Sequence, residues 1–327
     1  MSFVLKIAPK LQFIRDSQHM IRKQSLPLQA KIIIKSAVTL NFSGHLTDCS
    51  SPRVMGILNV TPDSFYAASR AQEETAIRER AAQILSEGAA IIDVGAYSSR
   101  PGAAEVSEEQ EMQRLDMALS IIRQHFPEAL VSVDTFRSEV ARHCVRDFGV
   151  QLINDVSGGL LDDKLFETVA ELQVPYVLTH SGGLADAPVS ASDTFVEDLC
   201  RFFAERLQQL YALGVADVIL DPGFGFGKTL EQNYQLMHRL ADIIGLFPDN
   251  AFLVGVSRKS MIYRLLGTTP EESLNGTTVL HTIALQAGAH FLRVHDVREA
   301  VETTRIIGQL NKLQLDNCKI PNSESKL

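Results

Sequence analysis

From residue 52 onward, short apolar runs alternate along the chain with longer segments of mixed polarity. Each run is continuous, without polar residues at every second position, as is typical of strands buried on both faces of a parallel sheet. Eight runs are predicted as strands: Val54–Asn59, Ala90–Val94, Leu130–Asp134, Gln151–Asp155, Pro175–His180, Asp217–Asp221, Phe252–Ser257 and His290–His295.

The segments between these runs have the spacing of amphipathic helices. Apolar residues that recur at steps of three and four lie on one face of a helix. Such residues form two sets: Ile77, Ala81, Ile84 and Leu85 in one segment, and Met112, Leu115, Leu119, Ile122 and Phe126 in the next.

Two helix starts are also predicted. Ser107 and Gln110 have the spacing of a capping box. Thr269 precedes a proline and two acidic residues, which suit the cap and first turn of a helix. Both predicted starts fall between predicted strands, as a repeating strand–helix unit requires.

The regular alternation of strands and helices predicts a single-domain (β/α)₈ TIM barrel, an α/β fold. The main alternative is an open, doubly wound sheet. We expect the barrel to span residues 39–315, with a C-terminal tail at 316–327. Residues 1–38 are predicted to be a basic, poorly ordered N-terminal extension, because residues 1–35 contain seven Lys or Arg and one acidic residue. A transit peptide is the alternative for this segment.

Composition narrows the function classes. The 327 residues carry a net charge of −8, which argues against nucleic acid or an anionic membrane as the main partner. The four cysteines form no C-x-x-C pair, so we interpret them as free thiols of a cytoplasmic protein. No apolar run approaches the ~18 residues of a membrane-spanning helix.

Polar residues end almost every predicted strand. A single such residue is more often a helix cap or a turn residue. In a barrel, however, all eight carboxyl ends open on one face, where loops build the active site. Buried polar groups without partners are costly, so this rim is expected to be wet or filled by ligand. The residues are Asn59, Asp93, Asp134, Asn154, Asp155, His180, Asp221, Ser257, Arg258, Lys259, Arg293, His295 and Asp296.

These side chains, with one nearby arginine, fall into two chemical groups. Cationic donors suit a phosphate or diphosphate. Carboxylates and an amide suit the N–H and amino groups of a nitrogen heterocycle. Together they predict an enzyme for a flat polar heterocycle that carries phosphate. The cationic group is Arg100, Arg258, Lys259, Arg293 and His295, and the second group is Asp134, Asn154 and Asp221.

The segment GFGFGK resembles two nucleotide-binding motifs but fits neither. The first glycine of a P-loop would fall at Pro222, and the glycine spacing does not match G-x-G-x-x-G. We expect its glycines to let the backbone pass close to a ligand that Phe224 or Phe226 faces. The alternative is a flexible connection with one aromatic side chain in the core.

Seven motifs, in order, resemble the dihydropteroate synthase family over residues 40–310. They are MGILNVTPDSF (55–65), IIDVGAYSSRPG (91–102), VSVDT (131–135), INDVSGG (153–159), DPGFGFGK (221–228), VGVSRKSM (254–261) and RVHDV (293–297). The resemblance implies a folate-biosynthesis transferase that joins 6-hydroxymethyl-7,8-dihydropterin diphosphate to 4-aminobenzoate and releases pyrophosphate. It also implies Mg²⁺, sulfonamide binding and a homodimer.

The resemblance implies roles for individual residues. It makes Asp134, Lys259 and Arg293 catalytic and places Mg²⁺ and the diphosphate at Asn59. The other implied contacts form four sets: Asp134, Asn154, Asp221 and Lys259 around the pterin; Arg293 and His295 at the diphosphate; Ser99 and Arg100 in a mobile loop over it; and Phe226 and Ser260 near 4-aminobenzoate.

The chain departs from the family pattern in several loops. Ala67-Ala68-Ser69 replaces Asp-Gly-Gly, Tyr97 replaces Glu, and Ser99 replaces Thr; Thr179-His180-Ser181 replaces Met-His-Met. The altered segment Thr179-His180-Ser181, which the resemblance places in the wall of the pterin site, leaves a non-catalytic pterin-binding paralogue as one alternative. A methyltetrahydrofolate-dependent methyltransferase is another, although it would have no use for diphosphate ligands.

Overall fold

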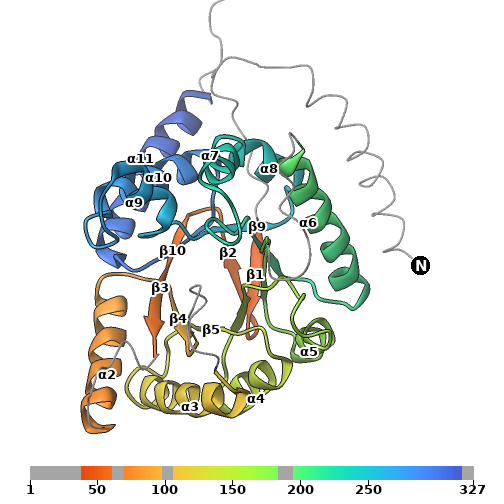
Figure 1. Cartoon of the computed structure of the whole chain (residues 1–327), viewed down its shortest axis with the longest axis vertical. Helices are drawn as coiled ribbons and strands as arrows, with labels where there is room; N and C mark the ends of the chain where they lie inside the picture. Colours follow the sequence, from red (N-terminus) through yellow and green to blue (C-terminus); the bar gives the residue numbers. More distant parts are fainter. Residues whose placement is uncertain (1–37, 61–69, 98–105, 183–193, 319–327) are drawn as a thin grey trace, which may run out of the picture.

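The computed structural model describes residues 38–60, 70–97, 106–182 and 194–318. Eight parallel strands close into a barrel in the order β10-β3-β4-β5-β6-β7-β8-β9, with helices around them (Figure 1). The predicted (β/α)₈ barrel is confirmed, and closure of the sheet excludes the doubly wound alternative. The barrel strands are β3 Arg53–Asn59, β4 Ile91–Gly95, β5 Val131–Asp134, β6 Leu152–Asp155, β7 Tyr176–Thr179, β8 Val218–Asp221, β9 Ala251–Val254 and β10 Phe291–Val294.

Helices follow the strands and cover the outside of the barrel. The capping box at Ser107 is confirmed: its side chain accepts from the Gln110 backbone, and α3 begins at the next residue. In the described ranges no helix is long and apolar enough to cross a membrane. The helices are α2 Arg70–Ser86, α3 Glu108–His125, α4 Ser138–Phe148, α5 Leu165–Leu172, α6 Phe195–Ala212, α7 Leu230–His238, α8 Leu240–Leu246, α9 Ser260–Leu266, α10 Leu274–Ala287 and α11 Val297–Cys318.

The predicted helix start at Thr269 is wrong. Helix α10 begins five residues later, at Leu274, and Ser273 is its N-cap. The Ser273 hydroxyl donates to the carbonyl of Pro270 at 2.7 Å, which closes a turn before the helix. The carbonyls of Pro270 and Glu271 also accept from Arg258, so a distant side chain takes the acceptors that a first helical turn would use.

An N-terminal hairpin, which the sequence analysis did not predict, precedes the barrel. Strands β1 (Thr39–Phe42) and β2 (His45–Asp48) pair antiparallel. Val38, Leu40 and Phe42 are buried in one cluster with the inward side chains at the starts of the barrel strands. The backbone N–H of Asn41 donates to Asp217 at 3.0 Å, which fixes the hairpin to the segment before β8. The hairpin therefore closes the N-terminal end of the barrel.

Inside the barrel, the inward side chains change from apolar to polar within two residues. Ile91, Leu152, Val177, Ile219 and Phe291 belong to the cluster that the hairpin covers. Because strand side chains alternate between faces, the residue two positions later points into the same interior, one layer closer to the rim. Asp134 pairs in register with Asn154 and lies at that level. We call this set the polar layer: Asp93, Asp134, Asn154, Thr179, Asp221 and Arg293.

Candidate active site

An ion triad crosses the polar layer. Arg293 donates from Nε to Asp93 Oδ2 at 2.6 Å and from Nη2 to Asp134 Oδ2 at 2.7 Å. The amide of Asn154 also donates to Asp93 Oδ2, at 3.2 Å. Burial, together with the nearby charge of Asp93, raises the pKa of Asp134 to about 7 against the opposing charge of Arg293. The structure thus brings Asn154 and Arg293 together on the buried Asp93 side chain and joins Asp134 to them through Arg293.

Asp93 belongs to this site, although the sequence analysis named it only as a polar strand ending. Its side chain is fully buried, and Oδ1 has no hydrogen-bond partner within the described residues. The signal that could have found it is its register. Asp93 follows Ile91 by two positions, as Asn154 follows Leu152, and both Ile91 and Leu152 belong to the apolar cluster that the hairpin covers.

Asp221 ends β8, and Lys259 follows the neighbouring strand β9 as the N-cap of α9. Asp221 Oδ1 accepts from the backbone N–H of Gly223 at 2.8 Å, and Oδ2 accepts no hydrogen bond from the described residues. Burial raises the pKa of Asp221, and the charge of Lys259 opposes that shift. Burial also lowers the pKa of Lys259 to about 8. The two side chains share no hydrogen bond in the described structure, so each keeps capacity for a ligand.

Lys259 also fixes the position of Phe226. Its Nζ donates to the carbonyl of Phe224 at 2.6 Å and lies 4.2 Å from the centroid of the Phe226 ring. Phe224 is fully buried, whereas Phe226 is partly exposed. Of the two aromatic candidates, Phe226 is therefore the one with a surface that a ligand could contact. Ser260 begins α9 directly after Lys259.

Two glycines of residues 221–228 serve a contact between two backbone segments, and the expected close approach to a ligand stays a prediction. A Cβ at Gly223 would lie 2.0 Å from the His180 carbonyl oxygen, and one at Gly227 would lie 1.4 Å from that of Gly182. Both glycines have positive φ, 69° and 60°. They therefore let this loop lie directly on the loop that follows β7. Lys228 holds the same contact, because its Nζ donates to the carbonyls of His180, Gly223 and Phe226.

A cavity of about 470 Å³ opens at the rim beside the ends of β3 and β10. His295 lines it, and its Nδ1 lies 3.2 Å from Ser257 Oγ. Burial, and secondarily the Arg293 charge, lowers the pKa of His295 to about 4, so its imidazole is neutral at pH 7 and not the cation that was expected. Arg80, which the sequence analysis missed, donates to the His295 carbonyl at 2.7 Å. The lining residues are Ile57, Leu58, Asn59, Ala76, Ile77, Arg80 and His295.

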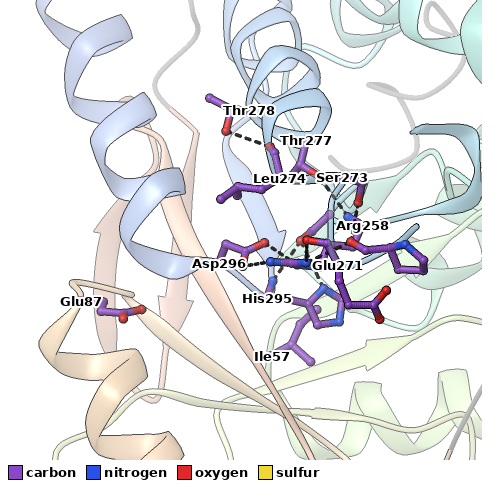
Figure 2. A network of polar contacts seen from close by, with 12 residues as sticks. Ile57, Glu87, Arg258, Glu271, Ser273, Leu274, Thr277, Thr278, His295 and Asp296 are labelled. Carbon is purple, nitrogen blue, oxygen red and sulfur yellow. Dashed lines mark hydrogen bonds and ion pairs between the residues drawn. The ribbon is translucent and has the colours of Figure 1, made fainter. Parts of the chain in front are cut away.

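Two polar strand endings are not positioned for a ligand. The ring of His180 packs edge-on against Phe202 of α6, with centroids 5.1 Å apart, and burial lowers its pKa to about 3. The guanidinium of Arg258, expected to bind phosphate, is bonded to Asp296 and to two carbonyls (Figure 2). The predicted residues Ser99 and Arg100 lie outside the described residues.

Tyr97, one of the departures from the family pattern, contacts the triad directly. Its hydroxyl donates to Asp134 Oδ1 at 3.2 Å, on the oxygen that Arg293 does not use. Its ring packs edge-on against Phe136, with centroids 5.3 Å apart. Thr179, another departure, is fully buried and pairs in register with Asp221. Both departures therefore lie beside residues of the polar layer.

Comparison with known proteins agrees with this geometry. Residues 55–295 match the family described as pterin binding enzymes. The dihydropteroate synthase of Escherichia coli strain K12 is 43% identical over 270 residues, which cover 81% of this chain and 93% of that protein. The dihydropteroate synthase of Streptococcus pyogenes serotype M3 is 36% identical over 262 residues, covering 79% and 95% of the two chains.

Solved structures give the same result. The Xanthomonas albilineans dihydropteroate synthase, solved with 4-aminobenzoic acid, has a TM-score of 0.74 and 36% identity, covering 84% of this chain and 98% of that one. A Yersinia pestis dihydropteroate synthase solved with a sulfonamide drug has the same TM-score at 37% identity, covering 84% and 100%. The barrel, its polar layer and the family match thus define a pterin-binding enzyme. Within that class, the chain belongs to the dihydropteroate synthase family of transferases.

Proposed function

We propose that this chain joins 6-hydroxymethyl-7,8-dihydropterin diphosphate to 4-aminobenzoate, forming 7,8-dihydropteroate and pyrophosphate for folate synthesis. In this reaction a C–O bond to the diphosphate breaks, a C–N bond forms, and the amine loses a proton. The observation that carries the proposal is the polar layer, where carboxylates, an amide and the guanidinium of Arg293 lie one level above the apolar cluster that the hairpin covers. Such a site can recognise the donor and acceptor edges of one flat heterocycle.

The pterin is assigned to the deepest part of the site. Asp221 Oδ2 would accept from a ring N–H and the exocyclic amine, and Lys259 would donate to a ring acceptor. The unshared Oδ2 and the separation of the two side chains from each other support this assignment. Asn154 and Asp134 would complete the pterin contacts.

Asp134 is assigned the central electrostatic role. When the C–O bond breaks, positive charge develops on the methylene carbon and the pterin ring. An ionised Asp134 in a buried site stabilises that charge more strongly than it would in water. Attack by the aromatic amine then requires positioning and loss of a proton.

The other substrate parts are assigned toward the rim. Arg293 and neutral His295 would donate hydrogen bonds to the diphosphate, beside the cavity that His295 lines. Phe226 and Ser260 would lie near 4-aminobenzoate, and Ser99 and Arg100 would contribute from their loop. Sulfonamides, which share the ring and amine of 4-aminobenzoate, would compete for this position.

Asn59 is suited to a metal that arrives with the diphosphate. Its exposed side chain lines the rim cavity, and the described residues contain no cluster of three or more His, Cys, Asp or Glu that could hold an ion alone. Mg²⁺ is commonly held by one or two protein oxygens, waters and substrate phosphates. Mg²⁺ at Asn59 would neutralise charge on the departing pyrophosphate.

Turnover is therefore expected to stop in excess EDTA and to return when magnesium is added. Pyrophosphate release measured at fixed substrate concentrations checks this. Full turnover in EDTA would remove the metal role from Asn59. Asn59→Ala should raise the magnesium concentration needed for half-maximal rate, whereas Asn41→Ala, on the hairpin, should not.

Homodimer formation and a cytoplasmic location complete the proposal. Two packed helices, α10 and α11, expose apolar side chains on the outside of the barrel, and such a surface suits a second copy of the chain. Cys49, Cys144 and Cys200 are unpaired and buried, which suits a reducing compartment. The exposed apolar residues are Val279 and Ile283 on α10 and Ile306, Leu310 and Leu313 on α11.

The decisive experiment is complementation of a strain that lacks the synthase, together with purified-enzyme assays of dihydropteroate formation. Growth and product formation support the proposal. Pterin binding without product would identify the non-catalytic paralogue. Methyl transfer from methyltetrahydrofolate without pyrophosphate release would identify the methyltransferase alternative.

A further inference from the structure

The connection between β9 and α9 contains an unusual backbone conformation. Arg258 has φ of 54°, in the left-handed region, although it is not glycine. A non-glycine residue adopts this conformation only where surrounding contacts hold it. The next residue, Lys259, returns to an extended conformation and is the N-cap of α9.

The Arg258 side chain supplies those contacts (Figure 2). Nε and Nη2 form a fork on the carboxylate of Asp296, at 2.9 and 2.7 Å. Nη1 donates to the carbonyls of Pro270 and Glu271, at 2.9 and 2.7 Å. The backbone N–H of Arg258 donates to Thr277 Oγ1 at 3.1 Å. We call the side-chain contacts the Arg258 clasp. All three guanidinium nitrogens are engaged in it.

The residues on either side of Arg258 point to the active site. Ser257 Oγ accepts from the backbone N–H of His295, at the rim cavity. Lys259 reaches the carbonyl of Phe224 and the ring of Phe226. A left-handed residue between them directs the Arg258 side chain outward and its two neighbours inward.

We propose that Arg258 is a positioning residue: its clasp holds the left-handed turn that presents Lys259 and Ser260 to the substrates. The clasp joins the connection after β9 to the segments before α10 and after β10. It therefore sets the relative positions of Lys259 and His295, which serve different parts of one substrate. The inference rests on the proposed function, because only that function gives Lys259 and Ser260 their substrates.

The alternative is that Arg258 binds the diphosphate itself, as a cation at a strand end would suggest. The two roles predict different outcomes for a matched pair of substitutions, Arg258→Ala and Arg258→Gly. Both remove the guanidinium, but only glycine adopts positive φ without steric cost. If Arg258 holds the left-handed turn, Arg258→Gly should keep part of the activity and pterin affinity that Arg258→Ala loses. If it contacts the diphosphate, the two variants should lose activity equally.

The measurements are kcat and KM for both substrates, affinity for 6-hydroxymethylpterin by calorimetry, and Tm. Arg258→Ala is expected to lose roughly 50-fold in kcat/KM, and Arg258→Gly to recover at least about fivefold of it, from the usual cost of a left-handed non-glycine residue. Pterin affinity should follow the same order. Asp296→Asn should resemble a milder Arg258→Ala, and Arg258→Lys should not replace the fork.

Arg123→Ala is the matched control. Arg123 also donates to backbone carbonyls, those of Ala129, Phe148 and Gly149, but from the C-terminal end of α3. It should lower Tm and leave kcat/KM and pterin affinity unchanged. Equal losses in the alanine and glycine variants, or a loss of Tm alone in both, would overturn the proposal. An inactive parent enzyme that still binds pterin would refute the proposed function. The pterin affinities of Arg258→Ala and Arg258→Gly would then still test whether the clasp positions Lys259.

Discussion

The two oxygens of Asp221 have different environments. Oδ1 accepts from the Gly223 backbone and supports the turn, while Oδ2 is the oxygen proposed to accept from the pterin. A single carboxylate therefore joins a structural role to a recognition role. An amide in its place can keep the first and must lose the second, since one of its two atoms is a donor.

Asp221→Asn should weaken binding of a pterin analogue by roughly 30- to 1000-fold, or about 2–4 kcal/mol, because a donor would face a donor in a buried site. Calorimetry with the analogue and with pyrophosphate, together with a thermal melt, measures this. Pyrophosphate affinity and Tm should change little, because the turn bond survives. Equal loss of both ligands with a lowered Tm would mean that Asp221 only supports the turn.

Tyr97→Phe should move the acid limb of the kcat/KM profile to higher pH. The proposed role needs ionised Asp134, so activity should fall as Asp134 is protonated with its pKa of about 7, and the Tyr97 hydroxyl stabilises the ionised form. Removing that donor raises the pKa further. The other groups that act on Asp134, Arg293, Asp93 and Glu111, are unchanged by this substitution.

The control for this profile is Tyr211→Phe. Tyr211 accepts a hydrogen bond from Asn250 at 2.7 Å, between α6 and the segment before β9. Its loss should leave the acid limb in place. If the acid limb of the kcat/KM profile also stays in place in Tyr97→Phe, Tyr97 packs against Phe136 without stabilising ionised Asp134.

At the scale of elements, the hairpin is the part of the fold most open to a stability test. Leu40 is 2% exposed beneath the barrel strands, whereas Leu46 on the other hairpin strand is 77% exposed. Leu40→Ala should cost about 2–5 kcal/mol in the free energy of unfolding. Leu46→Ala should change it by less than about 0.5 kcal/mol. Urea unfolding compares the two, and equal small effects would mean that the hairpin is not part of the cooperative core.

A chain that begins at Lys35 keeps the whole hairpin, because β1 starts at Thr39. It should fold and turn over like the full chain. Insolubility of this shorter chain would show that residues 1–34 contribute to the barrel. A chain that begins at Arg53 provides the contrast, since it lacks the hairpin and should unfold at lower urea concentration.

The barrel strands could be predicted because burial on both faces leaves a plain apolar run in the sequence. The hairpin was missed although its signals are present: Leu40 and Phe42 alternate with polar residues, and Ser43-Gly44 forms its turn. The start of α10 could not be placed, since Arg258, far from it in sequence, takes the carbonyls of Pro270 and Glu271.

The candidate site was predictable where register decides it. Asp134, Asn154 and Arg293 meet because each occupies an inward position of a barrel strand. The directions of His180 and Arg258 could not be predicted from strand endings alone, since both side chains leave the interior after the strand has ended. Arg80 enters the site from a helix, so no strand pattern marks it.

At the scale of the whole molecule, the exposed apolar face of α10 and α11 predicts a dimer. Ile306 is 63% exposed on α11, and Ile283 is 40% exposed on α10. Ile306→Glu should shift the molar mass in solution from twice that of the chain to that of one chain. Light scattering after size-exclusion chromatography measures this, with Leu46→Glu on the hairpin as the control. A monomeric parent protein would contradict the proposed dimer.

The hairpin also has a consequence for the entry of substrates and the release of products. Because it covers one end of the barrel with apolar side chains, ligands of the proposed site would enter and leave at the opposite end. In a site that is open at one end, the ligand nearer the opening has to leave before the deeper one. If the pterin ring lies deepest and the diphosphate nearer the opening, as proposed, pyrophosphate has to depart before dihydropteroate can pass its position. A slow exit of pyrophosphate would thus delay every later step of the cycle, however fast the new C–N bond forms.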